Sequence, residues 1–295
     1  MSIKVHEVFS EGNMGNIMQT ISIDISIKPG IVKHIHIGVT CTPEEIQLYT
    51  DLFREFRDVF AWSYEEMLGI DPSIVVHEIP TYPSAKPIRQ HLRPVHPQKA
   101  ATIKGEVEKL LKAGFIYPIL LTDWVSNIVL VAKKQGTIWV FFYYRNINRA
   151  CSKDNYPTPF IDQLIDDCAG SEIYSFMDGF SGYNQINISP VDQHKTTFIY
   201  PWGTFAYKKR PFGLKNAGAT FQCAMSYAFH DIPHVVQPYL DDLLAHSAKC
   251  HDHPTHLHEI FLRCRHYCIR LNLHKCVLCI ESGRVLGFFV SKEDI

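Results

Sequence analysis

Three aspartates have the types and spacing of a metal-dependent active site. The stretch "VVQPYLDDLLAHS", residues 235–247, places Asp241 and Asp242 side by side inside an apolar run. Two like charges repel each other there, and burial increases the cost. A third carboxylate, Asp178, ends the apolar segment "IYSFMD". If these strand ends converge, their oxygens suit Mg²⁺, and two such ions about 3.5–4 Å apart can drive phosphoryl transfer. A tight hairpin turn, where Asp is common, is the alternative interpretation.

The elements that must position these aspartates are short hairpins mixed with helices. Strands are predicted at 173–177 and on both sides of the Asp241–Asp242 tip. Helices are predicted at 42–60 and 99–113 and in the segments "NAGATFQCAMSYAFHDI" and "HPTHLHEIFLRCRHYCIRLN". Because the hairpins do not alternate strictly with helices, the pattern predicts an α+β fold.

A proline-rich stretch suggests a boundary within the chain. Six prolines fall between Asp71 and Gln98, and such a composition is typical of extended, linker-like chain. We therefore expect residues 1–78, including the helix at 42–60, to form an N-terminal extension and linker. This extension should pack loosely or separately from a main domain at 79–295.

Composition and charge are those of a globular intracellular protein. Apolar residues make up 46% of the 295 residues, enough to build a core. The net charge of -1 conceals basic clusters at 86–112 and 208–215, which either track phosphates or form solvated faces. The nine cysteines are an odd number and no secretory signal opens the chain, so we expect reduced thiols. No apolar run reaches the length of a membrane span, and we expect a cytoplasmic location without a membrane partner.

Several ordered motifs resemble those of reverse transcriptases. "YLDD" (239–242) resembles the signature hairpin, and "FMDGFSGYNQI" (176–186) resembles the strand with the first catalytic aspartate. "PFGLKNAGATFQ" (211–222) is similar to the segment beneath the incoming nucleotide and template. "LNLHKC" and "VLGFFVS" are similar to the last two blocks of the polymerase palm. The resemblance is to the Pol polyprotein of gypsy-type LTR retrotransposons of plants, and it extends from Trp62 to the end of the chain.

This resemblance implies both a fold and an activity. The fold would be a right-hand polymerase with fingers and palm, in which helices flank an antiparallel palm sheet. The activity would be RNA-directed DNA synthesis, in which two Mg²⁺ ions, or Mn²⁺ as a substitute, help add dNTPs to a primer 3′-OH on an RNA or DNA template. Family members act in cytoplasmic virus-like particles. The thumb is expected to be largely absent, because the chain stops just after the primer-grip turn.

The resemblance also implies roles for individual residues. Asp178, Asp241 and Asp242 would hold the metal ions, and Lys275 would be the general acid for the leaving pyrophosphate. Tyr183 would be the steric gate, a ring that clashes with a ribose 2′-hydroxyl and so favours dNTPs. The other implied site residues are Gly179 beside the metal, Arg145, Phe212 and Gly213 at the nucleotide, and Leu286 and Gly287 at the primer grip. Plainer alternatives remain: Tyr183 as a core residue, Lys275 as a solvated lysine, and Leu286 and Gly287 as an ordinary turn.

One motif departs from the family pattern. The segment "IWVFFYYRNIN", residues 138–148, corresponds to a fingers strand that usually reads like "IRVCVDFRDLN". Trp139 replaces the arginine that clamps the triphosphate, and Tyr143 replaces an acidic residue. Tryptophan cannot make charge-assisted hydrogen bonds to phosphate, so Lys133 and Lys134 on the preceding turn are candidates for that contact. The alternative function is therefore a catalytically impaired remnant that binds nucleic acid, and a structural subunit is a third hypothesis.

Histidine and cysteine clusters near the C-terminal end leave a zinc site as a minor alternative. The residues are His251, His253, His256, His258, His266, Cys264, Cys268, Cys276 and Cys279. Cys264 and Cys268 fall on the apolar stripe of a predicted helix, where free cysteine behaves as a small hydrophobe. We predict that these thiols belong to the core.

Overall fold

The computed structural model describes residues 14–16, 19–26, 33–132 and 138–292, which divide into two compact units. The first unit contains Met1–Trp62, Pro157–Gly182 and Gln222–Ile295, and the second contains Ser63–Tyr156 and Tyr183–Phe221. Two elements, η3 (Gly182–Gln185) and α5 (Ala217–Phe229), carry the chain from one unit to the other.

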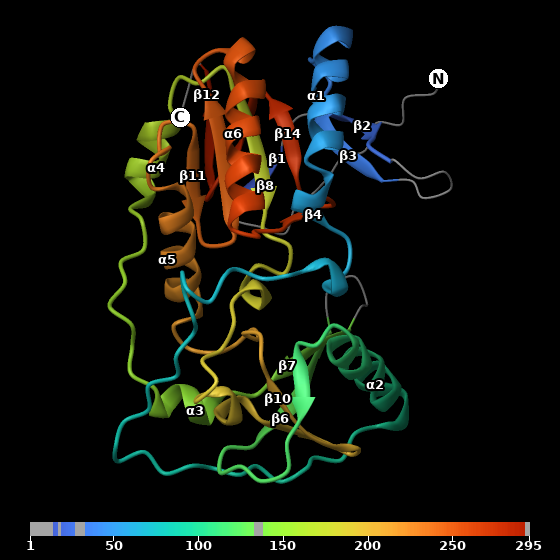
Figure 1. Ribbon diagram of the computed structural model, residues 1–295, viewed down its shortest axis with the longest axis vertical. Helices are drawn as coiled ribbons and strands as arrows, with labels where there is room; N and C mark the ends of the chain where they lie inside the picture. The colour runs from blue at the N-terminus through green and yellow to red at the C-terminus, as the bar shows by residue number, and fades with distance from the viewer. Residues whose placement is uncertain (1–13, 17–18, 27–32, 133–137, 293–295) are drawn as a thin grey trace. The chain divides into compact units, whose positions relative to one another are not determined.

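A six-stranded sheet forms the centre of the first unit (Figure 1). Its strands follow the order β11 (Val236–Tyr239), β12 (Asp242–Ser247), β8 (Ile173–Asp178), β14 (Val277–Ile280), β3 (His34–Gly38) and β2 (Thr20–Asp24). All neighbours are antiparallel except β14 and β3, which are parallel. The predicted antiparallel sheet is thus confirmed with one exception. Parallel neighbours need a long crossover, which the chain between β3 and β14 supplies.

The remaining elements of the first unit surround this sheet. The helices are α1 (Pro43–Glu55), α4 (Ile161–Cys168) and α6 (His253–His266), with short 3₁₀ turns η1 (Arg57–Val59) and η5 (Cys250–Asp252). A second sheet has the order β1 (Met14–Asn16), β15 (Ser282–Val285) and β16 (Phe288–Ser291). A two-stranded pair joins β4 (Phe60–Ala61) to β13 (Leu271–Asn272).

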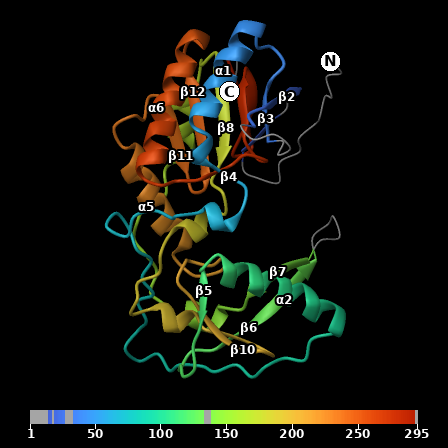
Figure 2. The ribbon, with the colours of Figure 1, turned by 45° about the vertical axis from the view of Figure 1, so that its right-hand side comes forward.

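Strand β8 is covered on both faces, which explains its unbroken apolar sequence. Tyr174 and Phe176 pack in a buried cluster with Leu164 and Ile165 of α4. Ser175 points to the other face, where its Oγ lies 2.8 Å from Nε2 of His253 on α6. Figures 1 and 2 show α1 and α6 together on this second face. Strands buried on both sides lose the alternation of half-exposed strands, and only the end of β8 can carry a charged residue toward solvent.

The helix predicted at 42–60 is α1, and it ends earlier than predicted, at Glu55. Its start is well specified: the Thr42 side chain accepts a hydrogen bond from the Glu45 amide, and the Glu45 carboxylate accepts one from the Thr42 amide. The apolar run continues beyond the helix, because η1 and β4 follow directly and Val59, Phe60 and Ala61 are buried as well.

The expected loose packing of residues 1–78 is wrong for the described part of that segment. Phe53, Phe56 and Phe60 surround Phe261 of α6, with ring centroids 6.0, 5.6 and 5.5 Å from that ring. In addition, β3 pairs with β14 in the central sheet. The boundary between units falls after Trp62 rather than after residue 78. The apolar stripe of α1 needs a buried partner, and α6 provides it.

The second unit contains a five-stranded sheet with the order β5 (Ile116–Pro118), β10 (Gly203–Tyr207), β9 (Phe198–Tyr200), β6 (Ser126–Ala132) and β7 (Ile138–Phe142). Its helical segments are η2 (Tyr64–Glu66), α2 (Pro97–Lys112), α3 (Arg145–Ala150) and η4 (Gln193–Thr196). The predicted helix at 99–113 is α2, which begins two residues earlier at a proline suited to a first helical turn. No helix among the described residues is long and apolar enough to cross a membrane.

Candidate active site

The three predicted catalytic aspartates lie together at one end of β8 and β12. Asp178 ends β8, Asp242 begins β12, and the two residues face each other directly in the antiparallel register. Just beyond this pair, the Gly179 amide donates a hydrogen bond of 2.7 Å to the Asp241 carbonyl. Side chains directly opposite on such a pair have Cβ atoms about 4.5–5.5 Å apart. Two strand ends therefore bring carboxylates from distant parts of the sequence to one edge.

A two-residue turn presents Asp241 and Asp242. Tyr239 pairs with Asp242, so Leu240 and Asp241 form the turn between β11 and β12. Leu240 has φ +54°, a left-handed conformation that costs a residue with a side chain about 1 kcal/mol or more. The turn must therefore be held in place by contacts from outside the hairpin.

Gln222 provides those contacts, a role that its position in the sequence did not predict. Its Oε1 accepts a hydrogen bond of 2.7 Å from the Leu240 amide, and its Nε2 donates one of 3.0 Å to the Pro238 carbonyl. The Gln222 side chain is fully buried on α5. The sequence does contain a signal for this role, which is a glutamine inside the apolar helical segment "GATFQCAM". A polar side chain buried in such a helix needs hydrogen-bond partners.

Lys275 is the fourth predicted catalytic residue, and it contacts this group directly. Its Nζ lies 2.9 Å from Oδ2 of Asp178, whose side chain is only 14% exposed. Burial alone would lower the pKa of Lys275, but the Asp178 carboxylate outweighs burial and the pKa is raised. Lys275 is therefore protonated at neutral pH.

The carboxylates perturb one another in the way expected of an anionic cluster. Burial, followed by the charges of Asp241 and Asp178, raises the pKa of Asp242 to about 7. Burial also raises the pKa of Asp178, and Lys275 opposes this shift. The cluster thus holds more negative charge than one ammonium group offsets, which is the condition under which a cation binds favourably.

The donor set fits a hard divalent cation in its chemistry. Three carboxylates at one sheet edge supply oxygen ligands, which Mg²⁺ prefers. Across the ranges that the structure describes, no three His, Cys, Asp or Glu side chains are already arranged as a metal cluster. The Asp178 carboxylate is turned toward Lys275 instead.

The predicted primer-grip residues also lie in the first unit, at the turn between β15 and β16. Leu286 and Gly287 have φ values of +51° and +99°, and Val285 pairs with Phe288 across them. Two successive positive φ angles are typical of a tight two-residue hairpin turn. The Leu286 side chain packs against the buried cluster that contains Tyr174 and Phe176, so the turn is anchored to the sheet that carries Asp178.

The predicted steric gate, Tyr183, lies in the second unit within a group of aromatic rings. The rings of Phe212 and Phe221 meet it nearly edge-on, with centroids 5.2 and 5.8 Å away and interplanar angles of 73° and 86°. The guanidinium carbon of Arg210 lies 4.1 Å from the Tyr183 ring centroid. Tyr183 and Phe212, which the resemblance assigned to one pocket, are therefore neighbours.

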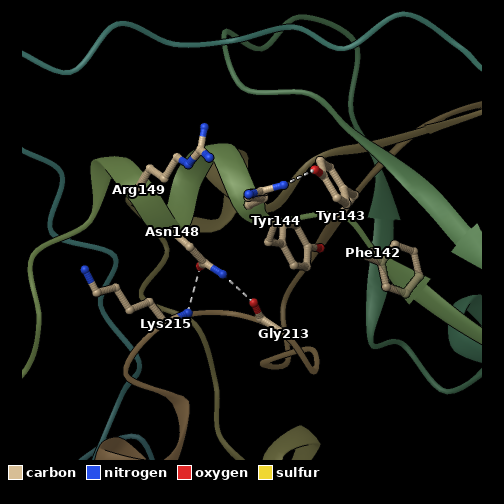
Figure 3. Close-up of a pocket in the computed structure, with 8 residues that line it drawn as sticks. Phe142, Tyr143, Tyr144, Asn148, Arg149, Gly213 and Lys215 are labelled. Atoms are coloured by element: carbon tan, nitrogen blue, oxygen red, sulfur yellow. Dashed lines mark hydrogen bonds between the residues drawn. The ribbon is translucent and has the colours of Figure 1, made fainter.

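A basic pocket of about 660 Å³ lies in the same unit (Figure 3). Asn148 joins its two sides: Nδ2 donates to the Gly213 carbonyl at 2.7 Å, and Oδ1 accepts from the Lys215 amide at 2.8 Å. Its lining residues are Phe142, Tyr143, Tyr144, Arg145, Asn148, Arg149, Gly213 and Lys215. Two predicted nucleotide-site residues, Arg145 and Gly213, thus share a pocket. Lys215 belongs to the basic cluster at 208–215, whereas Arg149 had no predicted role, although a basic residue so close to the motif at 138–148 was a signal.

Of the two positions that depart from the family pattern, Tyr143 lines this pocket. Arg145 Nη1 lies 3.4 Å from the Tyr143 hydroxyl, and this hydrogen bond lowers the pKa of Tyr143. Trp139 stands opposite Val131 in the pairing of β6 with β7. Lys133 and Lys134 lie outside the described residues.

The histidines and cysteines considered for zinc take part in packing and hydrogen bonding. Cys264 and Cys276 are fully buried, and burial raises their thiol pKa values. His253 lies between two serines, with Nε2 2.8 Å from Ser175 Oγ and Nδ1 2.7 Å from Ser247 Oγ. The prediction of a core position is confirmed for Cys264, whereas Cys268 is half-buried and lies beyond the end of α6.

Comparisons with known proteins agree on one family. Residues 131–290 match the family described as "Reverse transcriptase (RNA-dependent DNA polymerase)". The chain is similar to the Transposon Tf2-3 polyprotein of Schizosaccharomyces pombe, with 28% identity over 250 residues that cover 82% of this chain and 18% of that polyprotein. It therefore spans less than a fifth of that relative's length.

Solved structures give the same answer for the fold. The foamy viral protease-reverse transcriptase in complex with RNA/DNA hybrid superposes with a TM-score of 0.76 at 18% identity, covering 86% of this chain and 34% of that one. The same foamy viral protein in complex with dsDNA gives a TM-score of 0.75 at 17% identity, covering 86% of this chain and 52% of that one. The fold is that of polymerase fingers and palm, as predicted.

Proposed function

Because this chain belongs to the reverse transcriptase (RNA-dependent DNA polymerase) family, we propose that it is the fingers and palm of an RNA-directed DNA polymerase. We assign the first unit to the palm and the second to the fingers. The main observation behind this proposal is that Asp178, Asp241 and Asp242 lie together at one edge of the central sheet. Lys275 contacts the carboxylate of Asp178 there. The similarity to the Tf2-3 polyprotein supports an origin in a gypsy-type retrotransposon Pol polyprotein.

The palm residues would bind divalent cations and handle the proton of the leaving group. Asp178, Asp241 and Asp242 are the ligands. Gly179, whose carbonyl the resemblance places beside the metal, directly follows Asp178 at the end of β8. Bound Mg²⁺, or Mn²⁺ in its place, supplies Lewis acidity and positive charge. Lys275 is protonated at neutral pH and can give a proton to the departing pyrophosphate oxygen.

The fingers residues would hold the nucleotide and nucleic acid. Phe212 and Gly213 line the dNTP site, and Tyr183 excludes a ribose 2′-hydroxyl by contact. Arg145, with the other cations of the basic pocket, would bind phosphate groups. Leu286 and Gly287 of the palm would contact the primer end. A template–primer partner is supported by the foamy viral structures, which are complexes with RNA/DNA hybrid and with dsDNA.

Primer extension tests this function. Purified protein is incubated with poly(rA)/oligo(dT), dTTP and either Mg²⁺ or Mn²⁺. We expect extension that Asp241→Asn abolishes, because the substitution removes a metal ligand while keeping the size of the side chain. A matched control is Asp231→Asn, which alters an exposed carboxylate that pairs with Arg263. Extension that survives Asp241→Asn would overturn the proposed site.

The alternative is an impaired remnant that binds nucleic acid without efficient synthesis. Trp139 and Tyr143, at positions where the family carries charge, favour it. The two functions separate in one comparison: a remnant retains salt-dependent binding of the template–primer but gives no extension with either metal.

A further inference from the structure

Arg210 is a fully buried arginine beneath the predicted steric gate. Its guanidinium carbon lies 4.1 Å from the centroid of the Tyr183 ring, the distance of a cation–π contact. The residue has 0% exposure and is the largest fully buried side chain among the described residues. A buried guanidinium cannot reach a phosphate in solvent, so a direct contact with nucleotide or template does not explain its place.

The backbone and side chain of Arg210 are both fixed. Its amide donates a hydrogen bond of 2.8 Å to the Ile186 carbonyl, three residues after the gate. Its Nη1 donates one of 3.0 Å to the Ala217 carbonyl, at the first residue of α5. The backbone of Arg210 is thus tied to the segment that follows the gate, its guanidinium is tied to the start of α5, and the Tyr183 ring lies over the guanidinium.

Two aromatic rings also flank Tyr183. Phe212 and Phe221 lie at 73° and 86° to the plane of the Tyr183 ring, so neither is stacked parallel to it. Phe221 is 1% exposed and cannot easily move, whereas Phe212 is 40% exposed. Of these three neighbours, Arg210 is the one that contacts the flat face of the ring with a charge.

We propose that Arg210 is a positioning residue that fixes the Tyr183 ring and thereby sets discrimination between dNTPs and rNTPs. This inference rests on the proposed function, because it assumes that Tyr183 is the steric gate. A gate excludes a 2′-hydroxyl only while the ring cannot rotate away. Rotation would break the cation–π contact, which is stronger in a desolvated site than at a surface. The guanidinium therefore acts through the ring and not on the substrate.

The first test measures selectivity in a double-mutant cycle. The ratio of kcat/KM for dNTP over rNTP is measured for wild type, Arg210→Met, Tyr183→Ala and the double variant. We expect Arg210→Met to lower this ratio by up to about 30-fold, the equivalent of about 2 kcal/mol, mainly through a lower KM for rNTP. In the Tyr183→Ala background it should change the ratio less than twofold. An unchanged ratio in Arg210→Met, or an equal loss in both backgrounds, would overturn the proposal.

Two further variants separate a positioning role from a general loss of structure. Arg210→Lys keeps the charge and should restore part of the selectivity. Arg265→Met is the matched control, because Arg265 also lies over an aromatic ring, 4.3 Å from the centroid of Phe56 in the palm. It should leave the selectivity ratio unchanged. A loss of selectivity in Arg265→Met equal to that in Arg210→Met would contradict a specific role.

A second measurement does not need catalysis. Fluorotyrosine placed at position 183 reports the ring by ¹⁹F NMR. We expect one sharp resonance in the wild type, a shifted and broadened one in Arg210→Met, and an intermediate one in Arg210→Lys. If the wild type fails to extend primers, the proposed function fails, but this spectrum still tests whether Arg210 holds the ring. Identical spectra in wild type and Arg210→Met would overturn the inference on its own.

Discussion

Gln222→Leu should loosen the hairpin that carries Asp241 and Asp242. The substitution keeps the approximate volume of the side chain and removes its hydrogen bonds to the Leu240 amide and the Pro238 carbonyl. Each buried group left without a partner costs about 1–3 kcal/mol. Leu240 and Pro238 are half-buried residues rather than core residues, so the lower end of that range applies to each group.

The strain of the turn does not add to this loss, because Leu240 at φ +54° carries its cost of about 1 kcal/mol or more in the wild type already. We therefore expect Gln222→Leu to lower the free energy of unfolding by about 2 kcal/mol, from two groups that each lose a hydrogen-bond partner. A carboxylate displaced by 1 Å can cost about 100-fold in rate, so kcat should fall by about 10–100-fold with little change in dNTP KM.

The assays are urea unfolding and single-turnover primer extension. Gln237→Leu is the matched control, because Gln237 lies in β11 of the same hairpin but is partly exposed and donates to the Pro233 carbonyl outside the turn. Gln222→Glu should be intermediate, since it keeps an acceptor for the Leu240 amide and loses the donor to Pro238. If Gln222→Leu matches Gln237→Leu in both stability and rate, the hairpin does not depend on this contact and the reasoning is refuted.

Three further predictions concern packing, pH and the nucleotide clamp. Phe261→Ala should lower the free energy of unfolding by about 3–5 kcal/mol, because the ring is central to the contact between α1 and α6. Phe289→Ala, at an exposed ring, should cost far less. Similar urea midpoints for the two variants would contradict the importance of this contact. Burial, then nearby histidines, lowers the pKa of His253 from 6.5 to about 3, so below pH 6.5 the unfolded state binds a proton that the native state does not. Stability should fall by about 1.4 kcal/mol per pH unit toward pH 3, and a His253→Gln variant with the same acid slope would argue against this source. Trp139→Arg should lower the dNTP KM by about 10–100-fold through a charge-assisted phosphate contact, and an unchanged KM in an extending enzyme would show that another group already holds the phosphates.

The sequence by itself determined the features that depend on local pattern. Apolar runs that end in aspartate predicted β8 and the hairpin of β11 and β12, because a buried strand can carry charge only where it leaves the core. The adjacent Asp241 and Asp242 indicated a cation site, because unpaired carboxylates repel. Ordered motifs placed the chain among polymerases of the fingers-and-palm fold.

Tertiary structure decided every contact that joins distant segments. The proline-rich stretch suggested a detached N-terminal extension, but β3 pairs with β14 and the rings of α1 close on Phe261. The ion pair of Lys275 with Asp178 spans 97 positions, and the clamp of Gln222 on Leu240 spans 18. Arg210 lies beneath the Tyr183 ring. Its segment contains several lysines and arginines, and the sequence does not indicate which of them is buried and which are solvated. Local pattern tells which face of an element is apolar, and only the folded chain determines what covers it.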